Sequence, residues 1–400
     1  MLELSVNDLF FHLFGLLFSL LFSRGGQYMQ IRRVLTHELK QAALLAEDVF
    51  CADGDRYMES SFPALFQTGI SHSYGAFTPE GVLVSFMGMV PVQIQSGTYT
   101  VSAYSIGAVC THPDYRGQGL AGQLLELCRQ HARSAGASVL FISGDRSLYT
   151  RVGSVPFGQI SVFELSTASF STLPDASLHL SYRDLLPQDI FAVAHHIQAQ
   201  YAHIRWGLGD LQQFIAAHPM ANINKQQQHI RVAETADHQV AGFVILSIPY
   251  EEDTATSRIG SVIEYGGDPE VVYPLFADAI THYQLSSLTV RIPWQDKSLI
   301  DLFLKANIPV SIEKNGGTLL VLDHDLLLEQ TGVQDFLNAH DIKVQLDNGY
   351  ALHTPSASYP FNSAQEWYDL LFDPVATFTV EMNLAFPTVP LPYLYGLYFI

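Results

Sequence analysis

The segment from Val109 to Ala121, VCTHPDYRGQGLA, constrains the fold of this chain more than any other stretch of its 400 residues. Before it, Tyr104–Val109 is short and mostly apolar, as a buried strand would be. After it, leucines recur at helical spacing as far as Arg133. Between the two, Arg116-Gly117-Gln118-Gly119 leaves the backbone open to close approach. Because amide N–H groups at a helix start bind anions, the segment indicates a strand–loop–helix unit with a pyrophosphate site.

Other phosphate-binding loops do not match this segment. It lacks the Gly-Lys-Ser/Thr of a P-loop, and it lacks the three-glycine spacing of a dinucleotide fingerprint. A tight turn with a solvated Arg116 is the structural alternative. The run Arg116-Gly117-Gln118-Gly119-Leu120-Ala121 instead resembles the Arg/Gln-x-x-Gly-x-Gly/Ala motif of the GNAT N-acetyltransferases. His112-Pro113-Asp114-Tyr115, just before it, is similar to that family's approach to the loop.

The resemblance implies acetyl-CoA as co-substrate and no metal. It assigns the pyrophosphate to the loop and helix start, namely Arg116, Gly117, Gln118, Gly119, Leu120 and Ala121. It also implies that backbone N–H groups near Val109 and Cys110 polarise the thioester carbonyl and line the pantetheine arm, because this strand separates from its neighbour in GNAT sheets. A covalent acyl-enzyme on Cys110 is the alternative. Without a His partner at fixed spacing, we expect Cys110 to be a small strand residue.

The length of the chain predicts more than one domain, because 400 residues exceed one ordinary core. We expect a first domain over residues 29–178. It would hold a hairpin of residues 81–92 and 98–109, a strand at 139–143 after the loop helix, and a returning strand at 157–165. With 48% apolar and 15% charged residues, the composition is that of a globular chain.

Residues 179–322 repeat this order without the glycine loop. Strands are expected at 240–249, 258–265 and 288–293, with a helix at 271–282. In place of the glycines stands Asp268-Pro269-Glu270-Val271, where Glu270 would repel a pyrophosphate and a β-branched side chain would block the backbone. The predicted fold class is therefore α/β with mixed sheets: tandem GNAT folds, the second degenerate, with one acetyl-CoA site per chain.

The N-terminal residues 1–28 contain a Leu- and Phe-rich run at 9–22. As a helix this run would reach about 21 Å, short of the roughly 30 Å of a hydrocarbon core. Glu3 and Asp8 occupy the region that is basic in a signal peptide. We expect an extension outside the fold, and a peripheral membrane anchor is the less favoured alternative.

The C-terminal residues 323–400 differ from both folds in composition. They contain one Lys, no Arg and ten carboxylates. Helices are expected at 333–340 and 364–372, and strands at 343–352 and 377–384. These elements predict a small α+β module.

Tyr149 is the candidate acid for a departing thiolate, because a phenol is protonated at neutral pH. A packed tyrosine at a helix end is the alternative. The run Tyr149-Thr150-Arg151-Val152-Gly153, followed by Pro156 and Gly158, is similar to the tyrosine segment of the Eis-type (enhanced intracellular survival) acetyltransferases. Those proteins join two GNAT folds to a sterol-carrier-like C-terminal module.

The Eis-type resemblance implies that the chain's own C-terminal carboxylate acts as the proton acceptor, a role that falls here on Ile400. The tail before it is aromatic, proline-stiffened and free of charged side chains, so we expect it to be buried. A terminal strand packed on the core is the alternative. Asp145 and Glu164 are the substitute bases.

The net charge limits the classes of binding partner, and the cysteine content bears on the cellular location. A net charge of −19 argues against nucleic acid and would draw in a cation. Three scattered cysteines indicate no disulfide framework, and a cytoplasmic location is the default.

The predicted function is direct acetyl transfer from acetyl-CoA to a primary amine of a cationic small molecule or lysine, with Trp206 a candidate for lining the substrate cleft. Membrane association is not expected, and a homo-oligomer follows only from family analogy. The alternatives are a catalytically lapsed acyl-CoA-binding or assembly protein, and lipid binding by residues 323–400.

Overall fold

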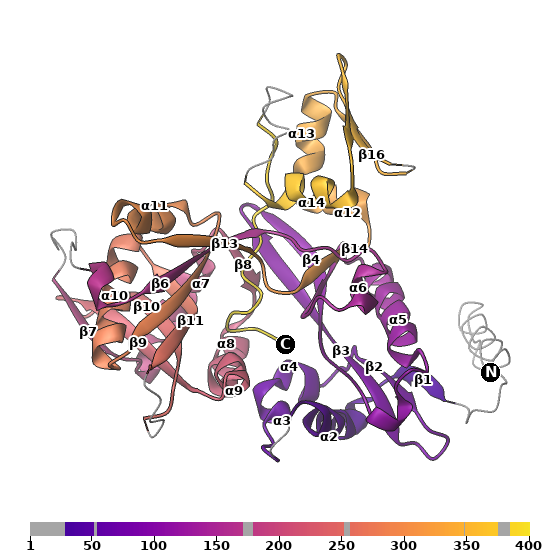
Figure 1. The fold of residues 1–400 in the computed structure, drawn as a ribbon, viewed down its shortest axis with the longest axis horizontal. Coiled ribbons are helices and arrows are strands. Elements are labelled where there is room, and N and C mark those ends of the chain that lie inside the picture. The colour runs from indigo at the N-terminus through magenta and orange to yellow at the C-terminus, as the bar shows by residue number, and fades with distance from the viewer. Residues whose placement is uncertain (1–28, 52–53, 171–178, 252–256, 348, 375–384) are drawn as a thin grey trace, which may run out of the picture.

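The computed structural model describes residues 29–51, 54–170, 179–251, 257–347, 349–374 and 385–400. The extension expected at residues 1–28 and the strand expected at 377–384 lie outside these residues. Within them, two seven-stranded mixed sheets stand side by side, and a three-stranded sheet lies at the top of Figure 1. The predicted α/β class with mixed sheets is confirmed.

The first sheet has the order β1-β2-β3-β4-β5-β14, with β8 paired to the far end of β3. Its strands are β1 (Gln30–Arg33), β2 (Tyr74–Phe77), β3 (Leu83–Ser96), β4 (Tyr99–Thr111), β5 (Val139–Ile142), β8 (Ala202–Arg205) and β14 (Thr318–Val321). The expected hairpin is therefore present as β3 and β4, and the strand after the loop helix is present as β5.

Helices cover both faces of this sheet. They are α2 (Leu39–Phe50), α3 (Met58–Ser61) and α4 (Pro63–Phe66) on one face, and α5 (Leu120–Ser134) and α6 (Ser147–Thr150) on the other. Alternation along β3 supplies both cores, because Phe86 packs with the α2 cluster and Met87 with the α5 cluster. On α5 the buried Leu120, Leu124 and Cys128 repeat every four residues, which places them on one face of the helix.

The second sheet has the order β13-β6-β12-β11-β10-β9-β7. Its strands are β6 (Gln159–Leu165), β7 (Leu180–Asp184), β9 (Gln227–Thr235), β10 (Val240–Ile248), β11 (Ile259–Gly267), β12 (Ser287–Pro293) and β13 (Val310–Lys314). Its helices are α7 (Ile190–Gln198), α8 (Leu208–Ala217), α9 (Pro219–Ile223), α10 (Pro269–His282) and α11 (Lys297–Lys305). The series β10-β11-α10-β12 repeats β3-β4-α5-β5, with the same antiparallel and parallel pairings. The predicted repeat is thus confirmed.

The strand expected to return at residues 157–165 lies in the other sheet. It forms as β6, but β6 pairs antiparallel with β12 and β13. The edge of β5 is taken instead by β14, from near the end of the second repeat. A short apolar strand can pair with any open sheet edge, so its hydrophobic pattern does not predict which strand will lie beside it. Each sheet therefore contains a strand from the other half of the chain, and the boundaries 29–178 and 179–322 stay a prediction.

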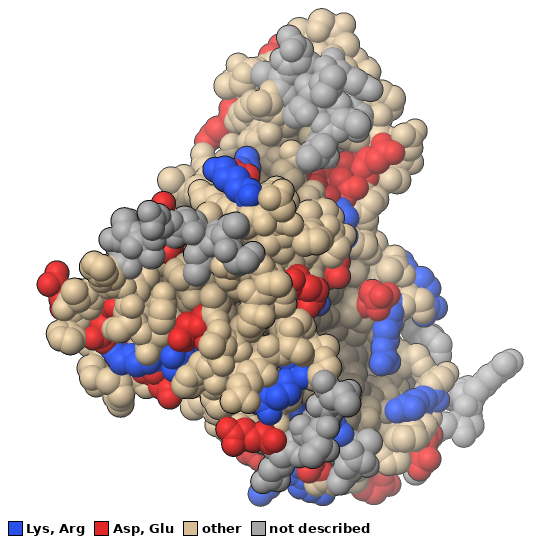
Figure 2. Space-filling view, turned by 60° about the vertical axis from the view of Figure 1, so that its left-hand side comes forward, with Lys and Arg blue, Asp and Glu red and all other residues tan. Residues whose placement is uncertain are grey.

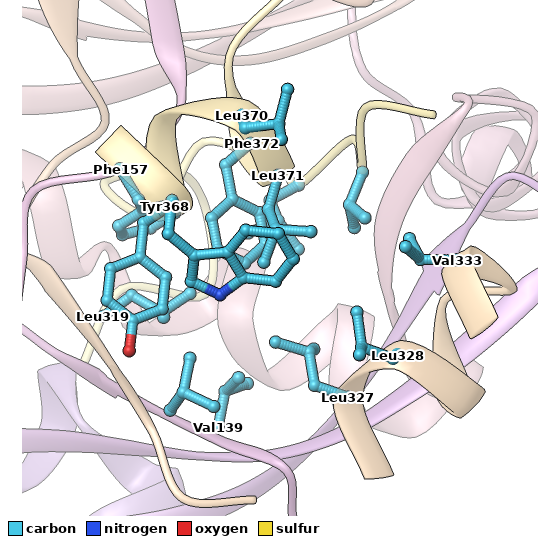
Figure 3. Packing of buried hydrophobic residues seen from close by; sticks show 14 of the residues in the cluster. Val139, Phe157, Leu319, Leu327, Leu328, Val333, Tyr368, Leu370, Leu371 and Phe372 are labelled. Atoms are coloured by element: carbon cyan, nitrogen blue, oxygen red, sulfur yellow. The ribbon is translucent and has the colours of Figure 1, made fainter. Parts of the chain in front are cut away.

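The C-terminal module contains both expected helices. Its elements are α12 (His324–Gln330), α13 (Val333–Ala339), α14 (Ala364–Phe372), β15 (Lys343–Gln345), β16 (Tyr350–His353) and β17 (Ser358–Phe361). The strand expected over residues 343–352 is divided into β15 and β16. Figure 3 shows Tyr368 and Phe372 of α14 near Phe157 and near Leu319 of β14. The described part of the module thus shares its core with the first sheet.

Candidate active site

The glycine loop forms an open turn before α5. Gly117 and Gly119 have φ values of +77° and +75°, a backbone region that favours glycine. An added Cβ at either position would meet no atom within 4 Å, so conformation rather than space requires the glycines. The first backbone bond of α5 joins Gln123 N–H to the Gly119 carbonyl at 3.2 Å. Within the described part of the chain, no backbone bond uses the N–H groups of residues 117–122.

Arg116 adds a cation to these free N–H groups. Its Nε donates to the Thr111 carbonyl at 3.2 Å, which ties the exposed side chain to the end of β4. Several amide donors, a helix N-terminus and a guanidinium together fit a pyrophosphate. The loop can therefore hold the anionic part of an acyl-CoA. The roles of Gln118, Leu120 and Ala121 in that contact stay a prediction.

Strands β4 and β5 separate beside this loop. Their parallel pairing runs from Ala103 and Val139 to Ile106 and Ile142, where β5 ends. Strand β4 continues to Thr111, so its last residues have no β5 partner. A register shift between Phe86 and Gly88 of β3, together with a φ of +50° at Ala108, marks a bulge at the same level. The resulting opening in the sheet contains Val109 and Cys110.

Cys110 has the properties of a packing residue. Its side chain is 3% exposed and lies in the α2 cluster. Burial raises the pKa of the Cys110 thiol to about 12, so the thiolate needed for covalent catalysis is scarce at neutral pH. This agrees with its expected role as a small strand residue.

Tyr149 approaches the opening from the α5 side of the sheet. It lies on α6 and packs in the cluster that contains Ile106, Ile142 and Cys128. A Cβ built on Gly144 would lie 3.7 Å from its ring. Burial raises the pKa of Tyr149 to about 12, which keeps the phenol protonated at neutral pH. The residue is thus chemically suited to donate a proton.

Ile400 reaches the same opening from the opposite face. Its side chain is 6% exposed and packs with Phe62, Leu65 and Phe66 in the α2 cluster. A Cβ built on Gly107, the first residue of β4 beyond the paired region, would lie 2.3 Å from the carboxyl carbon and an oxygen of Ile400. The terminal carboxylate therefore rests on the backbone of β4 where the strands separate. The expected burial of the terminus is confirmed.

A cavity of about 420 Å³ is lined in part by Ile400. It is lined by Ser105 and Ser143 of the first fold, Trp206, Asp210 and Phe214 of the second, and Tyr395, Phe399 and Ile400 of the tail. The cavity thus lies between the two folds. Sequence reasoning singled out Trp206 but missed Asp210 and Phe214, because nothing local links α8 to the first sheet.

Of the two substitute bases, only Glu164 lies away from the site, whereas Asp145 lies near Tyr395, which lines the cavity. Glu164 belongs to β6 in the second sheet, where it accepts a hydrogen bond from Thr289 Oγ1 at 2.8 Å. Because β6 pairs in the second sheet, Glu164 does not lie in the site of the first fold. Asp145 is exposed near Tyr395, whose pKa is raised by burial and, to a lesser extent, by that carboxylate. Within the described residues no cluster of three or more His, Cys, Asp or Glu side chains could hold a metal ion.

The loop, the separated strands and the order of elements together define an acyl-CoA-dependent acyltransferase fold. Consistent with this, residues 30–155 match the family model described as acetyltransferase (GNAT) domain. The chain therefore contains an acetyltransferase domain of the GNAT class. No curated protein sequence matches the chain.

Solved structures extend the likeness beyond that domain. Eis1 from Mycobacterium abscessus is 13% identical with a TM-score of 0.58, over 92% of this chain and 97% of that one. A GCN5-related N-acetyltransferase from Anabaena variabilis is 16% identical with a TM-score of 0.57, over 90% and 94%. A probable N-acyltransferase from Enterococcus faecalis is 13% identical with a TM-score of 0.59, over 76% and 75%. At these identities the likeness establishes the fold, and the tandem GNAT arrangement is confirmed.

Proposed function

We propose that this protein transfers an acetyl group from acetyl-CoA to a primary amine. The observation that carries the proposal is the position of Ile400, whose carboxylate lies on Gly107 where β4 and β5 separate. A thioester held by the loop before α5 would bring its acetyl group to this opening. The base and the acid then act from opposite faces of one sheet.

The proposed mechanism is direct transfer. The terminal carboxylate of Ile400 accepts a proton from the amine as its nitrogen forms a bond to the acetyl carbon. Backbone N–H groups of β4 near Val109 and Cys110, which have no β5 partner, stabilise the oxyanion. The C–S bond breaks, and the phenol of Tyr149 gives its proton to the thiolate. After transfer, the Tyr149 phenolate takes a proton from solvent, and the protonated Ile400 carboxyl group releases its proton to solvent.

The proposed acceptor is an amine on a cationic small molecule or on a lysine side chain. Supporting this, Asp210 and Ile400 line the cavity together with the aromatic residues Trp206 and Phe214. The chain also carries 39 acidic and 20 basic residues. On the face shown in Figure 2, acidic side chains appear at several separate places. A cation is attracted by such a surface.

Changing the terminus tests the proposed base. Deleting Ile400, or adding two glycines after it, should abolish amine-dependent thiol release, while acetyl-CoA binding measured by calorimetry stays within about twofold. The Ile400→Ala variant keeps a terminal carboxylate at the same position and should retain more turnover than the deletion. Full turnover in the deleted or extended chain would remove the terminal carboxylate from the mechanism.

Tyr149→Phe tests the proposed acid. The variant should lose about 100-fold in kcat at an unchanged KM for acetyl-CoA, because only proton donation is removed. Tyr74→Phe is the matched control, since Tyr74 packs against the same cluster and its hydroxyl lies 3.2 Å from His131 Nδ1. Acetyl-CoA binding without turnover of any amine in the unmodified protein would instead favour the lapsed binding protein.

Lipid binding by residues 323–400 gains no support from the described residues. Trp367, Leu371 and Phe372 are at most 1% exposed and belong to one buried cluster, part of which Figure 3 shows. The described part of the chain also has no helix long and apolar enough to cross a membrane.

A further inference from the structure

The C-terminal tail, residues 385–400, crosses between the two folds without forming a helix or strand of its own (Figure 1). Pro390 and Pro392 have no N–H group and favour an extended backbone. Around these prolines an extended backbone cannot pair its carbonyls with N–H groups of the same stretch, so other groups must satisfy them.

Three consecutive tail carbonyls accept hydrogen bonds from side chains. Ser96 Oγ donates to Pro390 O, Gln295 Nε2 to Leu391 O, and Asn315 Nδ2 to Pro392 O, each at 2.8 Å. These donors come from the end of β3, the loop after β12 and the loop between β13 and β14. The tail is therefore fixed from both halves of the chain.

Asn315 makes the most specific of these contacts. It is 4% exposed, and its Oδ1 accepts the Leu394 N–H at 3.0 Å while its Nδ2 holds Pro392 O. Both ends of the amide are thus used, which fixes the orientation of the side chain. The ring of Tyr395 lies on the next residue, Gly316, where a Cβ would approach it to 2.6 Å.

A second fixed point lies nearer the terminus, on β11. Strands β11 and β12 are paired only as far as Ser261 and Thr289, so they separate as β4 and β5 do. Glu264, beyond that point, lies beside the tail, because a Cβ built on Gly396 would be 3.3 Å from its Oε2. The Leu397 side chain is fully buried in the second fold.

We infer that the degenerate fold acts as a clamp for the catalytic terminus, with Asn315 and Glu264 as its positioning residues. In the first fold the opening between strands would receive the cofactor, whereas in the second it receives the protein's own tail. Ile400 is only three positions beyond Leu397, a span of about 10 Å at most. A loosened anchor would therefore displace the terminal carboxylate directly. The inference rests on the proposed role of Ile400.

The full-length Asn315→Ala variant tests the clamp. We expect kcat to fall 10- to 100-fold with an unchanged KM for acetyl-CoA, because misplacing a catalytic group by about 1 Å can cost about 100-fold. We also expect carboxypeptidase to release Ile400 and Phe399 faster than from the unmodified protein. Asn315→Asp, which keeps the acceptor and the volume but loses the donor, should show both effects if the alanine variant folds poorly.

Asn222→Ala is the matched control, because Asn222 Nδ2 also makes two hydrogen bonds, to Ser61 Oγ at 2.7 Å and Ala217 O at 3.2 Å, neither of them with a tail atom. It should match the unmodified protein in kcat and in release of the terminus. Unchanged kcat or unchanged release in both Asn315 variants would overturn the clamp. If the unmodified protein acetylates no amine, the proposed function fails, whereas slow release of its terminus and fast release from the variants would still establish the clamp.

Discussion

At the scale of single residues, Gly107 is where backbone and terminus approach most closely. A Cβ there would lie 2.3 Å from the Ile400 carboxyl group, and backbone atoms cannot yield cheaply to such a contact. We expect Gly107→Ala to lower kcat at least tenfold by displacing the carboxylate, as measured by steady-state thiol release. Gly209→Ala is the control, because a Cβ there meets no atom within 4 Å. Equal turnover in both variants would contradict the placement of the terminus.

Cys110 separates direct transfer from a covalent route. Its thiol has a pKa raised to about 12 by burial, and it therefore stays protonated at neutral pH. We expect Cys110→Ala to keep most of the turnover, and Cys110 of the unmodified protein to resist alkylation by iodoacetamide. Loss of turnover together with an acetylated Cys110 in mass spectra would instead establish an acyl-enzyme.

Sequence reasoning at this scale found some site residues and missed others. The glycine loop carries its own signal, because successive backbone N–H groups need little from distant residues. Asn315 and Glu264 carry no such local signal, since the tail residues that they contact are far away in the chain. Asn315-Gly316-Gly317 has the composition of a turn, and no local pattern connects it to Pro392.

At the scale of elements, the start of α5 and its loop should govern affinity for the cofactor. We expect Arg116→Gln to raise the Kd for acetyl-CoA about tenfold, equivalent to about 1.4 kcal/mol, with little change in kcat. Calorimetry at two salt concentrations measures this, and the difference should shrink at high salt. Arg129→Gln, which breaks an ion pair with Glu126 on the same helix, should bind normally. Equal affinity in both variants would mean that Arg116 is only a solvated turn residue.

Helices and strands with a strong hydrophobic periodicity were predictable from the sequence, but the neighbours with which the strands pair were not. The helix expected at residues 364–372 is α14, since its apolar spacing and the cap at Ser363 are both local features. The exchange of β6 and β14 was not predictable, because pairing depends on which edge is open when the chain is complete.

At the scale of the whole molecule, the docking of the tail on β11 should make stability depend on pH. Burial raises the pKa of Glu264 from 4.5 to about 7. The folded state therefore binds this proton more tightly than the unfolded state, and the stability so gained is lost as pH rises from about 4.5 through 7. We expect Glu264→Gln to unfold like the unmodified protein at pH 4.5 and to be more stable at pH 8, by up to about 3 kcal/mol.

Urea denaturation at both pH values measures this difference. Glu329→Gln, an exposed change on α12, should follow the unmodified protein throughout. If the free energy of unfolding of Glu264→Gln equals that of the unmodified protein at both pH values, the carboxyl group is solvated and the tail is held by other contacts.

The exchange of β6 and β14 also bears on how the protein is made. Ile142 pairs with Thr318, which is 176 residues further along the chain. At about 5–20 residues per second, a ribosome needs roughly 10–35 s to synthesise that interval. Throughout this time the β5 edge of the first sheet stands open, available to any passing strand. The nascent chain therefore has a defined period during which a chaperone would matter most, and it ends when residues 318–321 leave the exit tunnel.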